Sequence, residues 1–323
     1  MTSVRAVLGD RPASQLGRVD YHEHLFQVSP LLAGDELTDE ATSTREAELL
    51  YASGFHTMVD ATPTGLGRDP AGLARISAAT GLSILASTGA HREAHYGSSH
   101  WLLEKTTAQL ASRFVSDIQM GMPERDQPTE SQPALSPARK PVRAGVLKAG
   151  IGYWSITAFE RRVIEAVADA HAQTGAPVMV HLEYGSAAWE VLDLLAKSGV
   201  EASSVVLAHI DRNPDPGLHA ELAAHGAYPG YDGVARHKSW PDSVVLNCLL
   251  EAAQRGANER IILGGDVARR TRYIASGGMP GLAYLGDRFV PRIVEAGGND
   301  LTRMVLEANP QRWAARFSNL PMC

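Results

Sequence analysis

Several features are rare or missing in this chain of 323 residues. Its only cysteines, Cys248 and Cys323, are too few for a disulfide framework, which is typical of a cytoplasmic protein. No apolar run approaches the roughly 20 residues of a membrane span, and the first residues lack the apolar core of a signal peptide. The net charge is −6 and no basic stripe is visible, which argues against a nucleic-acid partner. We therefore expect a cytoplasmic protein that acts on a small molecule, without membrane or nucleic-acid partners.

Eight short apolar runs alternate with helical patterns along the chain. The predicted strands are Val19–Phe26, Thr57–Thr62, Ser83–Gly89, Arg143–Ala149, Pro177–Leu182, Val205–Ile210, Ala227–Tyr231 and Ile261–Asp266. Runs that are apolar almost throughout suit strands buried on both faces. Eight strand–helix units predict an α/β fold, a single (β/α)8 TIM barrel over residues 1–323 with its active site at the carboxyl ends of the strands. The main rival is a doubly wound open sheet, but its usual glycine-rich phosphate loop has no good match here.

Local signals between the strands support this alternation. Thr157-Ala-Phe-Glu160 is a capping-box pattern, which predicts a helix to about Thr174 that Gly175 stops. Residues 187–198 and 246–254 behave similarly. The polar, proline-rich segment 123–141 breaks the rhythm, and we predict a surface loop there rather than a domain linker.

The first predicted strand carries the motif His22-Glu23-His24. Because side chains alternate across a strand, the two histidines point the same way. Two imidazoles on one face are spaced for one metal ion. A pair of structural histidines would give the same pattern, so this motif alone decides little.

Four further residues with ligand-type or charged side chains stand at the ends of other predicted strands. They are Lys148, His181, His209 and Asp266. In a barrel these strand ends converge on one mouth. Since such groups at the end of an apolar strand cost desolvation unless they have a partner, packing alone explains the set poorly. We predict that His22, His24, Lys148, His181, His209 and Asp266 hold two divalent metal ions.

Lys148 is the unusual member of this set. A protonated lysine is repelled by cations, so it must have a lowered pKa, move away or change chemically. Carbon dioxide converts its amine to a carbamate, whose two oxygens can bridge metals about 3.5–4 Å apart. The alternative is an ordinary salt bridge from Lys148 to Asp266.

In order and context, these motifs resemble the phosphotriesterase family of the amidohydrolase superfamily, and the resemblance extends from Gly17 to Asn309-Pro310. The matching pieces are His22-Glu23-His24, Lys148 within Gly-Val-Leu-Lys-Ala-Gly, His181, His209 and Leu-Gly-Gly-Asp266. One departure is Val19, which stands where the family usually has a threonine and lies outside the ligand set.

The resemblance also implies how the ligands are shared. His22, His24 and Asp266 would hold the more buried ion, His181 and His209 the more exposed one, and carbamylated Lys148 with a hydroxide would bridge them. Zinc is the metal we expect, although cobalt, manganese or iron also suit such ligands. The hydroxide would attack an ester carbonyl or phosphoryl group, with Asp266 transferring the proton. A homodimer is expected by family analogy.

The loops after predicted strands seven and eight are rich in cations. They carry Arg236, Lys238, Arg269, Arg270 and Arg272. Barrels often bind phosphate at these loops, and arginine suits capture of an oxyanion. The resemblance implies that Lys238, Arg270 and Tyr273 bind the phosphate of a sugar lactone. Ordinary solvated loop charge, with Arg269 or Arg272 paired to surface carboxylates, is the alternative.

A polar loop after predicted strand three could line the pocket. It carries His91, Arg92, His95 and Tyr96, of which we select Tyr96 as a substrate contact, while a loop with no direct role fits equally well.

Taken together, these features favour a lactonase for a small anionic lactone, such as a sugar lactone phosphate. The alternatives are a phosphotriesterase or aryl esterase acting on organophosphates, a cyclic amidase or deaminase, and a metal-containing binding protein without catalysis. Lys148 argues against a deaminase, because deaminases of the superfamily generally lack the bridging lysine. The presence of all six ligand-type residues argues against a non-catalytic protein.

Overall fold

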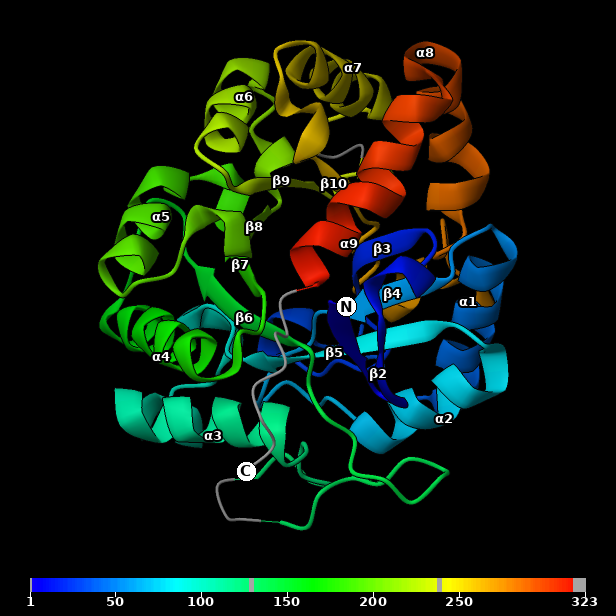
Figure 1. Ribbon diagram of the computed structural model, residues 1–323. Coiled ribbons are helices and arrows are strands. Elements are labelled where there is room, and N and C mark those ends of the chain that lie inside the picture. The colour runs from blue at the N-terminus through cyan, green and yellow to red at the C-terminus, as the bar shows by residue number, and fades with distance from the viewer. Residues whose placement is uncertain (1, 128–130, 237–239, 316–323) are drawn as a thin grey trace.

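The central element of the fold is a barrel of parallel strands. The computed structural model describes residues 2–127, 131–236 and 240–315 (Figure 1). The strands of the barrel are β3 (Val19–Glu23), β4 (Thr57–Asp60), β5 (Ser83–Gly89), β6 (Val146–Ile151), β7 (Val178–Leu182), β8 (Val205–Ala208), β9 (Tyr228–Tyr231) and β10 (Ile262–Leu263). They pair in chain order, and β10 lies beside β3, where the Asp266 N–H donates to the His22 carbonyl at 2.8 Å. The (β/α)8 prediction is therefore confirmed, and each predicted strand overlaps an observed one.

Helices surround this barrel (Figure 1). They are α1 (Glu40–Ala52), α2 (Pro70–Thr80), α3 (Thr107–Gln119), α4 (Ala158–Thr174), α5 (Ala188–Lys197), α6 (Pro216–Ala224), α7 (Asp242–Gln254), α8 (Val290–Arg303) and α9 (Asn309–Ala314). The predicted capping box of Thr157 and Glu160 opens α4, and Gly175 ends it with a left-handed φ of 67°. Helix α7 begins four residues before the predicted start at Leu246. None of the described helices is both long and apolar enough to cross a membrane.

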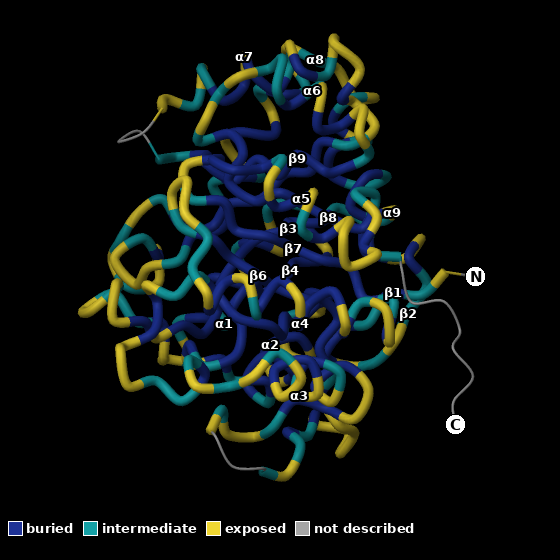
Figure 2. The backbone as a smooth tube through the Cα atoms, turned by 90° about the vertical axis from the view of Figure 1, so that its left-hand side faces the viewer, coloured by how far each residue is buried: buried dark blue, intermediate teal, exposed yellow. Residues whose placement is uncertain are grey.

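An N-terminal hairpin, which the sequence analysis did not predict, covers one end of the barrel. Its strands are β1 (Ser3–Ala6) and β2 (Gly9–Pro12), which pair antiparallel. Val4 and Ala6 pack with apolar side chains from inside the barrel and with Trp313 of α9. Figure 2 shows the buried strands at the centre and the exposed residues on the outer helices and loops. The amino ends of the strands are thus closed by apolar packing.

The proline-rich segment 123–141 packs back onto the barrel; its residues 128–130 lie outside the described part. Asp126 in this segment accepts hydrogen bonds from Arg68 at 3.2 Å and from Arg113 at 3.1 Å. Arg68 is buried and also donates to Asp117 at 2.7 Å. This ionic cluster fastens the segment to α3 and to the loop before α2.

Candidate metal centre

The six predicted ligands lie together at the carboxyl ends of the barrel strands. His22, Lys148 and His181 belong to β3, β6 and β7, whereas the other three follow β3, β8 and β10 closely in the chain. None of the six residues is more than 5% exposed. Parallel strands of a barrel end at the same mouth, which explains why residues far apart in the sequence meet here.

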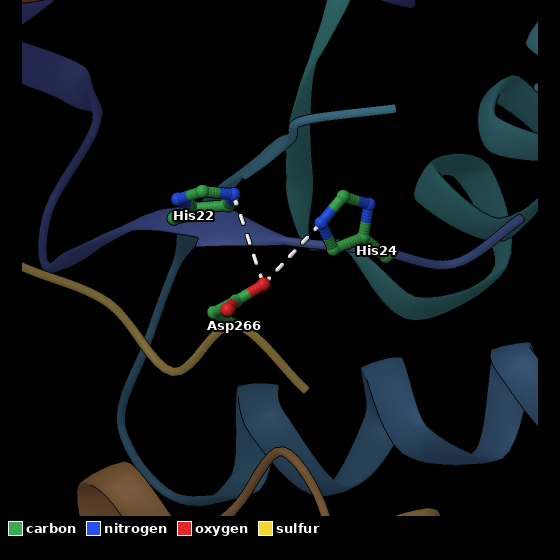
Figure 3. Close-up of side chains that lie close together, drawn as sticks. All are labelled: His22, His24 and Asp266. Atoms are coloured by element: carbon green, nitrogen blue, oxygen red, sulfur yellow. Dashed lines mark ion pairs between the residues drawn. The ribbon is translucent and has the colours of Figure 1, made fainter. Parts of the chain in front are cut away.

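His22, His24 and Asp266 form the first group of possible ligands. Asp266 Oδ1 lies 3.8 Å from His22 Nε2 and 3.5 Å from His24 Nε2, and the three side chains point toward one another (Figure 3). Ligand atoms on a tetrahedral ion with bonds of about 2 Å stand about 3.3 Å apart. The spacing therefore suits one shared cation.

Lys148 is fully buried beside this group. Its Nζ lies 3.4 Å from His22 Nε2 and 3.0 Å from Met179 Sδ. Among the described residues no carboxylate forms an ion pair with it, so the alternative salt bridge to Asp266 is not formed. Burial lowers the pKa of Lys148 to about 8, which leaves part of the amine neutral near pH 7. A buried, partly neutral amine beside an imidazole fits the reaction with carbon dioxide.

His181 and His209 form the other side of the centre. Their ring centroids lie 4.4 Å apart, and His209 lies 4.9 Å from the ring of His22. Nδ1 of His181 is buried and has no hydrogen-bond partner, whereas its Nε2 lies 2.8 Å from Glu183. Burial lowers the pKa of His209 to about 4 and that of His181 well below its usual range. Both imidazoles are neutral at pH 7, as metal ligation requires.

Asp232, whose role the sequence analysis missed, orients two of these imidazoles. It follows β9 directly, and its oxygens lie 2.6 Å from His209 Nδ1 and 3.0 Å from His22 Nδ1. The Tyr21 hydroxyl also donates to it. Burial alone would raise the pKa of Asp232, but His209 and His22 hold it well below its usual range. Carboxylates commonly fix ligating histidines in this way, with the other ring nitrogen facing the metal. Its place directly after a predicted strand was the available signal.

Asp266 makes a second set of contacts through its other oxygen. Oδ2 accepts hydrogen bonds from Arg212 Nη2 at 3.0 Å and from Arg236 Nη2. Burial would raise the pKa of Asp266, but Arg236 and the nearby histidines hold it well below its usual range. The sequence analysis did not single out Arg212, although it follows His209 by three residues.

The predicted substrate contacts have other partners in the structure. The Tyr96 hydroxyl accepts from the His91 N–H and donates to the Thr64 carbonyl, both at 2.9 Å. The Tyr273 hydroxyl donates to the His24 carbonyl. Both tyrosines are buried, and both spend their hydroxyl proton on backbone.

The predicted cations of the later loops divide into three kinds. Lys238 lies outside the described residues. Arg270 is exposed and donates to the Gly34 carbonyl at 3.1 Å, and Arg269 pairs with Asp35 at 3.1 Å as ordinary surface charge. Arg272 is largely buried, and its Nη2 has no hydrogen-bond partner. Of these cations, Arg272 alone combines burial with an unpartnered donor among the described residues.

The loop after β5 forms a wall beside His181. The His91 ring stacks against His181 with centroids 4.5 Å apart and against His95 at 3.8 Å. Arg92 pairs with Glu183 at 3.2 Å. The predicted polar loop therefore borders the metal centre.

A barrel whose strand ends gather neutral histidines, a carboxylate and a buried lysine is the architecture of a metal-dependent hydrolase that acts on ester bonds. The chain belongs to the phosphotriesterase family, whose model matches residues 2–314. The family depends on divalent metal ions, and the residues that could hold them here are those described above.

Individual relatives align over nearly the whole chain. A phospho-furanose lactonase of Mycoplasmopsis synoviae (strain 53) is 29% identical, over 95% of this chain and 90% of the relative. An N-acetyltaurine hydrolase of Danio rerio is 28% identical, over 96% and 97%. The crystal structure of a lactonase from Listeria monocytogenes superposes with a TM-score of 0.87 at 29% identity, covering 98% of this chain and 99% of that one. The chain is similar to enzymes of more than one substrate class.

Proposed function

We propose that this protein is a metal-dependent lactonase that opens a small anionic lactone, such as a phosphorylated sugar lactone, to its hydroxy acid. The observation that carries the proposal is the convergence of His22, His24 and Asp266 with His181 and His209 around buried Lys148. The lactonase relatives support the choice of a cyclic ester.

Two divalent ions, zinc being the metal we expect, fit the available donors. His22, His24 and Asp266 would hold one ion, His181 and His209 the other, and the carbamate of Lys148 would join the two sets. Bound metal ions would acidify a water molecule and polarise the carbonyl of the substrate. The unpartnered Nδ1 of His181 and the lack of a carboxylate partner for Lys148 support this assignment.

The protein's own groups would position and move the proton. Asp266 is ionised at neutral pH, so it would accept the proton that water releases and pass it to the ring oxygen that leaves. Asp232 would keep His22 and His209 in fixed orientations. These roles need no movement of the strands, because each group stands at the end of a strand or directly after it.

The anionic part of the substrate would bind to cations at the mouth. Arg272 has a buried donor without a partner, and Arg270 is exposed on the same loop. Lys238, Arg270 and Tyr273 stay predictions as phosphate contacts, as does Tyr96 at the pocket wall. Arg270 would exchange its contact with Gly34 for the phosphate, whereas the tyrosine hydroxyls would have only an oxygen lone pair to offer.

A substrate panel on the metal-loaded protein tests the proposal. The panel pairs lactones with and without a phosphate group, and adds N-acyl amides and a neutral phosphotriester. We expect two metal ions per chain and at least about tenfold preference for the phosphorylated lactone, roughly 1.4 kcal/mol of differential binding. The N-acetyltaurine hydrolase relative makes amide hydrolysis the second candidate, and faster amide than lactone turnover would favour it.

A further inference from the structure

The two oxygens of Asp266 face different surroundings. Oδ1 lies toward His22 and His24, at 3.8 and 3.5 Å from their Nε2 atoms. Oδ2 lies toward Arg212, at 3.0 Å, and Arg236. One carboxylate thus separates the ligand histidines from a pair of guanidinium groups. The arginines therefore lie at the reacting end of the site rather than at its outer rim.

Arg212 and Arg236 come from the loops after two neighbouring strands, β8 and β9. The Trp240 indole N–H donates to the Arg212 carbonyl at 3.0 Å, which joins the two loops. The side chains are only 15% and 24% exposed, so they are not freely solvated surface charges. Burial and then the charge of Arg212 lower the pKa of His209 to about 4, which agrees with a guanidinium close to the centre.

These arginines have more donors than their partners use. A guanidinium carries five N–H groups. Among the described residues, the Arg212 side chain donates to Asp266 alone, and the Arg236 side chain donates to the carboxylate and backbone of Asp266. Nε of Arg236 is buried and has no partner. Buried donors without partners are rare in folded proteins, so a ligand oxygen is the expected complement.

We propose that Arg212 and Arg236 bind the oxygens of the reacting acyl group, first as the oxyanion at the scissile carbonyl and then as the carboxylate of the product. This inference rests on the proposed lactonase activity. Water bonds to the carbonyl carbon, the ring C–O bond breaks, and the water proton passes through Asp266 to the ring oxygen. The product acid releases its remaining proton to solvent and becomes a carboxylate. Arginine pairs with such oxygens by charge-assisted hydrogen bonds, which strengthen as negative charge develops.

Calorimetric binding to the metal-loaded protein tests this role separately from turnover. The probes are D-ribonate 5-phosphate and D-ribitol 5-phosphate, which differ in having a carboxylate or an alcohol at the first carbon. We expect the wild-type protein to bind the ribonate at least tenfold more tightly. The variants Arg212→Met and Arg236→Met should each lose most of this preference, with little change in ribitol phosphate binding. Arg212→Lys should keep part of it, because it retains the charge but not the planar fork.

Two controls separate carboxylate binding from support of the site. Arg269→Met removes a cation of the loop after β10 that pairs only with Asp35, and should leave the preference intact. Metal content is measured in every variant. A wild-type protein without carboxylate preference would overturn the proposal. Unchanged preference in both methionine variants would do the same, and so would loss of metal together with binding of both probes.

The lactone panel is run on the same proteins, so that the two proposals fail in different ways. Lactone turnover without an arginine-dependent carboxylate preference sinks the role of Arg212 and Arg236 alone. A carboxylate preference that depends on the arginines, without any lactone turnover, supports the anion site and contradicts the lactonase.

Discussion

The two ends of the barrel are built from the same strands but differ in chemistry. At the amino end, Val206 of β8 and Ile262 of β10 pack into an apolar cluster with Trp313. At the carboxyl end, the same two strands lead into His209 and Asp266, which are buried among charged partners. A few residues along one strand thus separate a stabilising end from a reactive one, as is general for (β/α)8 barrels.

Backbone strain follows the same division. Most described non-glycine residues with a left-handed φ lie in loops that follow the carboxyl ends of strands. They are Trp154, Tyr184, Ala187, His209, Ala235 and Asp266, with Arg139 in the 123–141 segment as the exception. His209 at 66° and Asp266 at 48° are themselves predicted ligands. Non-glycine residues adopt this conformation only where surrounding structure holds them, and such residues cluster at functional sites. The mouth therefore sacrifices backbone comfort that the amino end retains.

Replacing Asp266 should break the reactive end most severely. Asp266→Asn keeps the shape of the side chain but removes its charge and its ability to take a proton. We expect kcat to fall on the order of a thousandfold, and metal content to fall less. Steady-state kinetics together with metal analysis measure both. An Asp266→Asn enzyme with unchanged turnover would refute the proton-transfer role.

Reloading with metal should depend on the state of Lys148. Only the neutral amine reacts with carbon dioxide, and burial lowers the pKa of Lys148 to about 8. Below that pKa the neutral fraction falls about tenfold per pH unit. Apoprotein given metal and a fixed concentration of dissolved carbon dioxide should therefore regain activity on the order of a hundredfold more slowly at pH 6 than at pH 8. Lys148→Met, the control, should show no dependence on carbon dioxide, and a wild-type rate that is independent of carbon dioxide would contradict the carbamate.

Asp232 should have a smaller effect, because it touches ligands and not the metal. In Asp232→Asn, His22 and His209 lose the charge that orients them. Changes of this kind typically cost 10- to 100-fold in metal affinity, which competition with a chelator measures. Asp10→Asn, which disturbs an ion pair with Arg5 at the amino end, is the matched control and should bind metal like the wild type. Equal affinities of the two variants would remove Asp232 from the site.

The sequence could predict the positions of the ligands because these depend on repeating geometry. Strand direction and the two-residue alternation place His22, His24, His181 and His209 at one mouth once the barrel is assumed. Lys148 then stands out, since a lysine at that mouth needs a chemical reason. Strand boundaries were less exact, because polar ligand residues extend the apolar runs without continuing the hydrogen-bonded ladder. Predicted Ile261–Asp266, for example, is observed as a strand only at Ile262–Leu263.

The partners of loop side chains could not be predicted in the same way. Tyr273 donates to the carbonyl of His24, which is 249 residues away in the chain, and no local pattern encodes that contact. The inward turn of Arg212 likewise depends on Asp266 from another strand. The N-terminal hairpin escaped prediction because its strands have only four residues each. Contacts between loops depend on the assembled barrel, whereas ligand positions depend on the strands alone.

The smallest effect is expected from a change at the amino end. Ile262→Val removes one buried methylene group, which should lower the free energy of unfolding by about 1 kcal/mol, as thermal or denaturant unfolding measures. Metal content and kcat should not change, since Ile262 packs in the apolar cluster with Trp313 and contacts no ligand. The test is stringent because Ile262 lies only four residues before Asp266 on the same strand and loop. Loss of metal or turnover in this variant would show that the two ends are coupled through β10, and the separation of stability from chemistry would not hold for this barrel.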